Sequence, residues 1–189
     1  MRRAITSLNV FESILARRSV RGYRGDDVGQ NAIRTLLEAA VRAPTALHEE
    51  PWAFVIVQDR QLLHLLSEHA KPLLAKEARP GIAFDVAAKP DFDIFHGAGT
   101  LIVICAKPTA HFAAADCWLA TENLMLAACA MGLGTCVIGS ALAALNMQEM
   151  KVQLDIPAEY SAIAPIIVGH PLGETPATSR REPFILAWH

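Results

Sequence analysis

Hydrophobic residues recur every three or four positions in several stretches of the chain, which is the spacing of a helix with one buried face. Asn9 with Glu12, and Asn146 with Glu149, have the spacing of a capping box, which marks the start of a helix. Proline and glycine are expected to end the helices, because neither residue continues a helix well. The helices predicted from these patterns cover approximately residues 10–19, 33–43, 62–79, 114–131 and 147–154.

Four shorter runs are rich in β-branched, aromatic and other apolar residues and have the length of strands. Pro165, inside the last run, favours an edge strand or a bulge, because proline cannot donate to a sheet ladder. The strands do not alternate regularly with helices, so the pattern favours an α+β domain over a doubly wound sheet. The predicted strands are Trp52–Val57, Thr100–Ala106, Thr135–Ile138 and Ala162–Val168.

The stretch Ala114–Met131 is apolar on nearly all sides, which a helix tolerates only when most of it is covered. The mean hydropathy of +0.28 is also high for a small monomer. Both features predict a homodimer, in which a second copy covers apolar surface. With 189 residues, the chain is expected to form one domain over residues 1–189. We expect a loop or lid at Arg79–Asp93 and an extended, proline-rich arm from about residue 169.

Charge and cysteine usage narrow the possible partners. The net charge of −2 provides no general attraction to nucleic acid or to an anionic membrane. The longest uninterrupted apolar run, Leu101–Ala106, is far too short to span a bilayer. The four cysteines lie in apolar segments without a C-x-x-C pair. They are therefore expected to be buried free thiols in a reducing, cytoplasmic setting, and no metal site is predicted.

The segment Arg17–Tyr23 carries the most informative chemistry. Its sequence, RRSVRGY, places three arginines and a serine within five residues, where a helix gives way to a loop. Arginine presents paired hydrogen-bond donors that suit a phosphate, and a serine hydroxyl adds another. A second pair, Arg180-Arg181, lies near the end of the chain and is a candidate for the same anion. A solvated helix end accounts for the first cluster equally well on residue counts alone.

Four segments, taken in order, resemble the nitroreductase family. They are RRSVRGY, the stretch from Pro44-Thr45 to Pro51-Trp52, the stretch Gly132–Gly139, and Arg181 two residues before Pro183. The resemblance implies a three-layer α-β-α fold with a central mixed sheet and a domain-intertwined homodimer. It also implies FMN bound without a covalent bond at the subunit interface, with NAD(P)H as the electron donor.

The same resemblance implies roles for particular residues. Arg17 would contact the FMN phosphate, Arg21 would also lie near the flavin N1/O2 edge, and Ser19 would contact the flavin. Arg18 lies inside the motif, and Arg181 would complete the phosphate site. A cation near N1 is expected because reduction places negative charge there. A backbone N–H at Ile138-Gly139 would bind flavin N5, and Gly139 has no side chain to obstruct the ring.

The Pro44–Trp52 stretch departs from the family pattern. Family members commonly have Pro-Ser, then Asn, then Gln-Pro-Trp, whereas this chain has Thr45, His48 and Glu50 at the corresponding positions. Thr45 and His48 are still expected to contact the flavin from across the dimer interface. Glu50 either changes substrate acceptance or FMN affinity, or pairs with a nearby arginine.

The flavin itself would carry the chemistry, so no protein side chain is assigned as catalytic. The expected reaction is ping-pong hydride transfer from NAD(P)H to a small acceptor such as a nitroaromatic or a quinone. The alternatives are an enone reductase or dehalogenase with the same motifs, a flavin-sequestering protein, and an anion-binding domain without flavin. His96 and His111 are candidate proton donors, but the commoner case of exposed loop histidines is expected for both. Asp116 and Asn123 are expected to satisfy buried polar partners rather than to act in catalysis.

Overall fold

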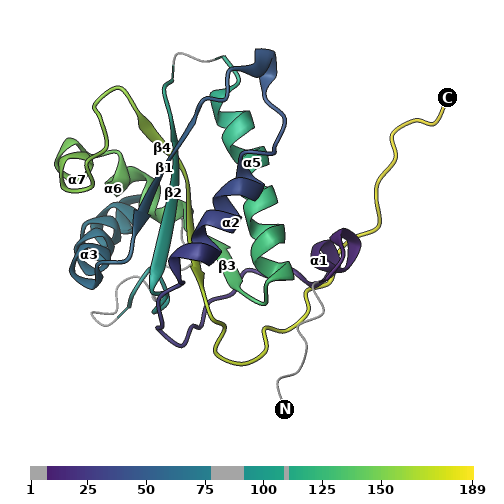
Figure 1. Cartoon of the computed structure of the whole chain (residues 1–189), viewed down its shortest axis with the longest axis horizontal. Coiled ribbons are helices and arrows are strands. Elements are labelled where there is room, and N and C mark those ends of the chain that lie inside the picture. The colour runs from purple at the N-terminus through teal and green to yellow at the C-terminus, as the bar shows by residue number, and fades with distance from the viewer. Residues whose placement is uncertain (1–7, 78–91, 109–110) are drawn as a thin grey trace.

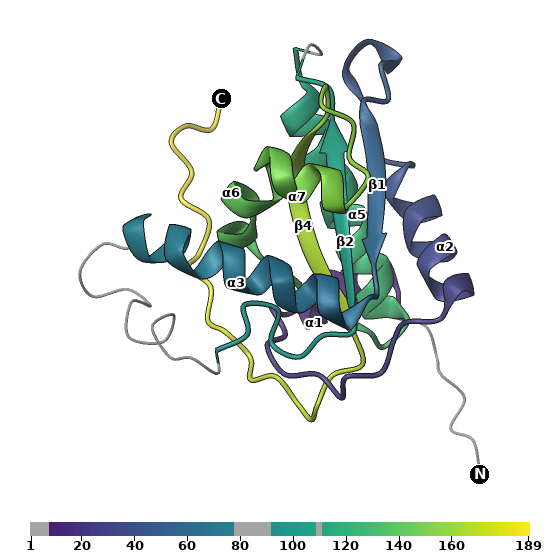
Figure 2. The same cartoon turned by 90° about the vertical axis from the view of Figure 1, so that its left-hand side faces the viewer.

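A sheet lies between two groups of helices in the computed structural model, which describes residues 8–77, 92–108 and 111–189 (Figure 1). One face of the sheet is covered by α3 (Arg60–Glu77), α6 (Leu142–Leu145) and α7 (Gln148–Gln153), which lie together toward the viewer in Figure 2. The other face is covered by α2 (Gln30–Ala40) and α5 (Ala113–Ala130). The expected three-layer α-β-α arrangement is therefore confirmed. The predicted loop or lid at Arg79–Asp93 falls largely outside the described residues.

The sheet has the strand order β1-β2-β4-β3, and every pair of neighbouring strands is antiparallel. Val57, at the end of β1, pairs with Leu101, at the start of β2, because the chain between them returns to the same end of the sheet. Among the described residues, the one parallel pairing is a single bridge between Ser19 and Thr135. The expectation of a mixed sheet is thus wrong for the four strands. They are β1 (Trp52–Val57), β2 (Thr100–Ala106), β3 (Gly134–Val137) and β4 (Ser161–Gly169).

The core has two parts because β2 and β4 are central strands with helices on both faces. Along β2, Leu101 and Val103 pack with the α3 side, whereas Ile102 and Ile104 pack with the α2 and α5 side. All seven residues of β2 are buried. The continuous apolar run in the sequence therefore reflects a strand that is covered on both faces.

Pro165 lies in a central strand, so the edge alternative for it is wrong. Ile104 pairs with Ala164 and Cys105 pairs with Ala162, which leaves Ile163 as an extra residue next to the register shift. The bulge alternative is thus confirmed two residues before the proline. The carbonyl of Pro165 accepts a hydrogen bond from the Ile138 amide at 2.9 Å, just beyond the end of β3.

Two capping boxes were predicted, and one is present. Asn9 and Glu12 bind each other's backbone amides at the start of α1 (Val10–Ala16). This helix ends before Ser19, because the chain there pairs with β3. The second box is wrong, because the side chain of Asn146 instead binds the backbone of Ala162 through both its oxygen and its nitrogen, at 2.9 and 3.1 Å.

Large apolar side chains are exposed at several places on the described surface of this single chain, and two groups of them are prominent. The outer face of α1 exposes Phe11 and Leu15, and the chain beyond Gly169 exposes Phe184, Leu186 and Trp188. This C-terminal arm, drawn in yellow, runs out from the layers past α1 (Figure 1). In the part of the chain that is described, no helix is both long and apolar enough to cross a membrane.

Candidate functional site

The arginine-rich segment runs beside the edge strand β3. After α1 ends at Ala16, the chain forms the bridge between Ser19 and Thr135, and the Val20 amide donates to the Thr135 carbonyl at 2.9 Å. Val20 is buried against Gly134, where an added Cβ would lie 2.8 Å from the valine side chain. Glycine at position 134 therefore allows the segment to lie directly against the strand.

The far end of the segment is held by the start of the C-terminal arm. The Arg24 amide donates to the His170 carbonyl at 3.0 Å, and the Leu172 amide donates to the Gly22 carbonyl at 2.9 Å. The Tyr23 hydroxyl donates to the Val20 carbonyl at 2.9 Å. These bonds fix residues 17–24 between β3 and the arm, so the backbone of the arginine cluster is organised within one chain.

The three arginines have few acidic partners. The Nε of Arg17 lies 3.6 Å from Oε1 of Glu122 on α5, and both side chains are partly exposed. The Nη1 of Arg18 donates to the carbonyls of Leu15 and Arg17 at 2.6 and 2.8 Å. Arg21 forms no ion pair with any carboxylate among the described residues. Such under-neutralised cations suit an external anion.

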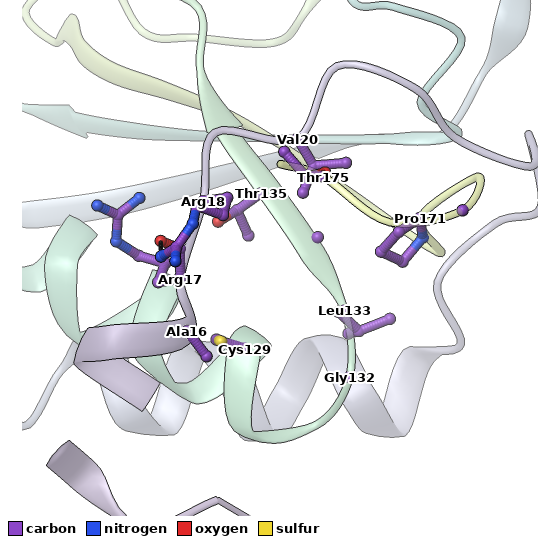
Figure 3. A pocket seen from close by; sticks show the side chains of 12 residues that line it. Ala16, Arg17, Arg18, Val20, Cys129, Gly132, Leu133, Thr135, Pro171 and Thr175 are labelled. Atoms are coloured by element: carbon purple, nitrogen blue, oxygen red, sulfur yellow. Dashed lines mark hydrogen bonds between the residues drawn. The ribbon is translucent and has the colours of Figure 1, made fainter. Parts of the chain in front are cut away.

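Arg17 and Arg18 line a cavity of about 210 Å³ (Figure 3). The end of α5 and the start of β3 contribute further lining residues, and Pro171, Gly173 and Thr175 of the C-terminal arm line another side. Some of its lining residues carried no sequence signal for this role, among them Cys129 on α5 and Thr175 on the arm. Cys129 was expected to be buried but is half-buried, whereas Cys105, Cys117 and Cys136 are buried as free thiols.

Ile138 and Gly139, which follow β3, differ in how accessible they are to a ligand. Ile138 is buried, and its amide is already used by the Pro165 carbonyl. Gly139 is exposed at the start of η2 (Gly139–Ala141), and an added Cβ there would meet no atom within 4 Å. The first amides of a helix have no partner within it. Gly139 is thus the member of this pair that a ligand can approach.

Arg21 lies among groups that are held in their neutral forms. Burial raises the pKa of the Tyr23 phenol strongly and raises the pKa of the Cys136 thiol, while the charge of Arg21 opposes both shifts. Burial lowers the pKa of His96, Arg21 lowers it further, and Asp93 raises it. His96 was expected to be an exposed loop residue, but it is half-buried, so that expectation is wrong. His111 is exposed, as expected.

The Pro44–Trp52 stretch lies at the opposite end of α5. The Ala46 amide, in η1 (Ala46–His48), donates to both carboxylate oxygens of buried Asp116 at 3.4 and 3.3 Å. Asp116 thus satisfies a polar partner as expected, and Asn123 does so by donating to the Ala39 carbonyl at 3.2 Å. Asp116 and Cys129 are thirteen residues apart, or about 20 Å along a helix that rises about 1.5 Å per residue. Figure 1 accordingly shows η1 and α1 at opposite ends of α5.

The structure therefore does not bring all the predicted site residues together within one chain. Arg17, Arg18, Ser19, Arg21 and Gly139 lie along β3, whereas Thr45 and His48 lie about one α5 length away. Glu50 is exposed and forms no ion pair among the described residues. Arg181 is exposed on the arm, next to Arg180, whose Nη1 donates to the Thr178 hydroxyl at 2.8 Å.

An antiparallel sheet between two helical layers, with a cationic segment along its β3 edge, defines an α+β protein that can hold an anion. The sequence profile of the Nitroreductase family matches residues 14–170. This chain therefore belongs to the nitroreductase family, and it is a nitroreductase-family enzyme.

Relatives extend over nearly the whole chain. A protein of Archaeoglobus fulgidus that carries the provisional name NADH dehydrogenase/NAD(P)H nitroreductase is 30% identical over 169 residues, covering 87% of this chain and 86% of that protein. The FMN-bound nitroreductase of Bacteroides fragilis is 25% identical with a TM-score of 0.79, over 94% of this chain and 99% of that chain. An FMN-bound nitroreductase of Desulfitobacterium hafniense is 20% identical with a TM-score of 0.83, over 94% and 99%, and supports the fold alone.

Proposed function

We propose that this protein is an FMN-dependent oxidoreductase that transfers hydride from NAD(P)H to a small acceptor such as a nitroaromatic or a quinone. The observation that carries the proposal is the segment 17–21, fixed beside β3 with cationic side chains that few acids neutralise. The bound FMN of the Bacteroides fragilis relative, and NAD(P)H in the name of the Archaeoglobus fulgidus relative, support the choice of cofactor and donor.

The residues of the chain fit FMN in their chemistry. Arg17, Arg18 and Ser19 offer the charge-assisted and hydroxyl donors that a phosphate requires. The cavity beside Arg17 and Arg18, of about 210 Å³, is smaller than the roughly 300–1,000 Å³ of typical small-molecule pockets. It therefore has room for the phosphate end of the cofactor, and the ring would lie farther along β3, toward Arg21 and Gly139.

Each residue then has a distinct task. Arg17 and Arg18 hold the phosphate, with Arg181 from the arm added when the arm is docked. Ser19 and Arg21 orient the cofactor along β3, and Arg21 places a fixed positive charge at the N1/O2 edge. The amide of Gly139, an exposed residue, would bind N5, and the bond from Ile138 to the Pro165 carbonyl would keep this backbone in place. When bound, FMN supplies hydride transfer at N5, so the protein provides binding, orientation and charge.

A homodimer completes this site. The separation of about 20 Å between the two ends of α5 supports a site in which Thr45 and His48 come from the partner chain. The exposed apolar face of α1, with Phe11 75% and Leu15 74% exposed, needs a cover. The apolar arm residues Phe184 and Trp188 are suited to pack on a partner, which gives the intertwined arrangement.

Purification and a simple assay test the proposal. The protein should be yellow, release one FMN per chain on denaturation, and oxidise NADH or NADPH faster when a nitroaromatic or menadione is added. A colourless protein that also fails to bind added FMN would overturn the proposal. Bound FMN without NAD(P)H oxidation would instead favour a flavin-sequestering role. Sedimentation should show a dimer at micromolar concentration.

A further inference from the structure

Asp116 is a buried carboxylate in the first turn of α5, and no step of the proposed flavin chemistry uses it. Its side chain is 3% exposed, although an ionised carboxylate is costly to bury without partners. The positive end of the α5 dipole favours a negative charge in this turn. Among the described residues, the carboxylate forms no ion pair, and its one hydrogen-bond donor is the Ala46 amide. The partner of this buried charge is therefore the loop of residues 44–50, which precedes β1.

The loop of residues 44–50 in turn depends on this contact. The residues of the loop with left-handed φ values are Leu47, His48 and Glu50. Residues other than glycine keep such values only when surrounding contacts hold them. The Glu49 amide donates to the Ala46 carbonyl at 3.1 Å, which is a bond within the loop. Among the described residues, the Ala46 amide is the one group of this loop that hydrogen-bonds to the rest of the chain.

The contact joins the loop to a rigid element. The Ala46 nitrogen lies 3.4 Å from Oδ1 and 3.3 Å from Oδ2 of Asp116, so both carboxylate oxygens share one amide. A hydrogen bond to an ionised group is stronger than a neutral one, and burial strengthens it further. The Asp116 amide donates to the Phe112 carbonyl at 2.9 Å within α5, so the carboxylate is attached to a hydrogen-bonded helix. Figure 1 shows the loop, in dark blue, next to this end of α5.

We propose that Asp116 is a positioning residue of the flavin site, which holds the loop so that Thr45 and His48 contact the flavin. The inference rests on the proposed function, because the loop is one half of the proposed two-chain site. Asp116 acts through the backbone of Ala46 and does not itself contact the flavin. Thr45 and His48 lie one and two residues from Ala46, so a shift of that peptide displaces both.

Hydrogen exchange in the FMN-bound protein tests the local contact. Asp116→Ala removes the carboxylate, whereas Asp116→Asn keeps its size and one acceptor oxygen but loses the charge. The Ala46 amide should exchange roughly tenfold faster in Asp116→Ala than in wild type, with Asp116→Asn in between. Unchanged exchange at Ala46 in Asp116→Ala would overturn the inference. If Asp116→Ala does not fold, the same comparison is made with Asp116→Asn.

FMN affinity, with a matched control, tests the consequence for the site. Asn123→Ala is the control, because it also removes a hydrogen bond from α5, in this case to the Ala39 carbonyl of α2. The Kd for FMN should rise about tenfold in Asp116→Ala and about threefold in Asp116→Asn, and Asn123→Ala should bind FMN like wild type. Equal losses in Asp116→Ala and Asn123→Ala would trace the effect to a general weakening of α5, and the inference would fail.

Mixed dimers distinguish positioning of the loop from damage to the whole chain. One chain carries Asp116→Ala and the other carries Arg21→Ala, with different affinity tags so that the mixed dimer can be purified. One site of this dimer then combines an unaltered arginine segment with an unaltered loop. About half of its sites should bind FMN with wild-type affinity, because a two-fold dimer has two equivalent sites. If Asp116→Ala instead disrupts the arginine segment of its own chain, no site recovers and the inference fails.

The outcomes also separate this inference from the proposed function. If the wild-type protein binds no FMN, the proposed function fails and this inference fails with it. If the wild-type protein binds FMN and Asp116→Ala binds it with the same affinity, only this inference fails, and Asp116 is a structural residue of α5.

Discussion

The two ends of α5 carry the two halves of the proposed site, and these halves are organised in different ways. At the C-terminal end, residues 17–24 are fixed by backbone bonds to Thr135, His170 and Leu172 within the same chain. At the N-terminal end, Leu47, His48 and Glu50 have φ values of 52°, 55° and 43°, and all three side chains are exposed. One half is complete in a single chain, whereas the other holds three strained residues with little packing around them.

This difference indicates which contacts hold each half in its conformation. Non-glycine residues in the left-handed region cost roughly 1–2 kcal/mol each, so three of them within four positions need outside contacts. In one chain, the contact that holds this loop is the bond from Ala46 to Asp116. We infer that a second copy supplies the remaining support, which is consistent with the proposed two-chain site.

The largest expected change in FMN binding comes from mixed dimers in which one chain carries a substitution in the arginine half and the other chain carries one in the loop half. Arg21→Ala removes the ring-end cation, and Thr45→Trp fills the loop half with a large side chain. Each homodimer should bind FMN poorly. After the two variants are unfolded and refolded together, dimers that contain one copy of each carry one site with both changes and one with neither. FMN binding should then return to about a quarter of all sites. If FMN binding does not recover in dimers shown to be mixed, both halves of the site belong to one chain.

The next prediction distinguishes Arg17 from Arg21 by their effects on FMN affinity and on the flavin potential. Arg17→Ala and Arg21→Ala should each weaken FMN binding by roughly 1.5–3 kcal/mol, about ten- to a hundredfold. Arg21→Ala should also lower the flavin potential, because its charge stabilises the reduced ring, whereas Arg17 lies at the remote phosphate. Redox titration of both variants, saturated with FMN, is the measurement. Equal flavin potentials in Arg21→Ala and wild type would mean that Arg21 does not lie at the N1/O2 edge.

Gly139→Ala tests whether the ring lies against the end of β3. The added methyl meets nothing within 4 Å in the free chain, so thermal stability without FMN should change little. Against a bound ring, the methyl should cost about 1–2 kcal/mol, roughly tenfold in FMN affinity. Gly29→Ala, at an equally open glycine at the start of α2, is the control and should bind FMN like wild type. Unchanged FMN affinity in Gly139→Ala would mean that the ring does not lie against Gly139.

The smallest expected change in stability and FMN affinity comes from substituting Glu122, whose carboxylate pairs with Arg17. Its pair with Arg17 is exposed and 3.6 Å long, so Glu122→Gln should change folding stability by about 0.5 kcal/mol or less. FMN affinity should rise a few-fold at low salt, because Arg17 is freed for the phosphate, and the gain should shrink at high salt. Glu159→Gln, which disrupts a similar exposed pair with Lys107 at 3.8 Å, should leave FMN affinity unchanged. Weaker binding in Glu122→Gln would mean that Glu122 orients Arg17 for the ligand.

Much of the fold was predictable from local pattern. The strand Thr100–Ala106 was predicted with its final bounds, because a continuous apolar run of this length is typical of a buried strand. The predicted helix 114–131 is one residue off at each end from α5. The capping box at Asn9 was predicted because both of its partners lie within one turn of helix. The same pattern at Asn146 misled, because the side chain found a backbone partner 16 residues away.

By itself, the sequence indicated the family and which residues we propose for the site. The arginine segment, Gly139 and the Thr45–His48 loop were all identified from composition, spacing and family resemblance. Only the tertiary structure decided that Arg21 lacks an acidic partner among the described residues, that His96 is half-buried, and that the loop lies at the other end of α5. Charge balance, burial and distance depend on segments far apart in the chain, such as residues 21, 96 and 136. No local pattern specifies these quantities, because they arise only when the packed sheet brings those segments together.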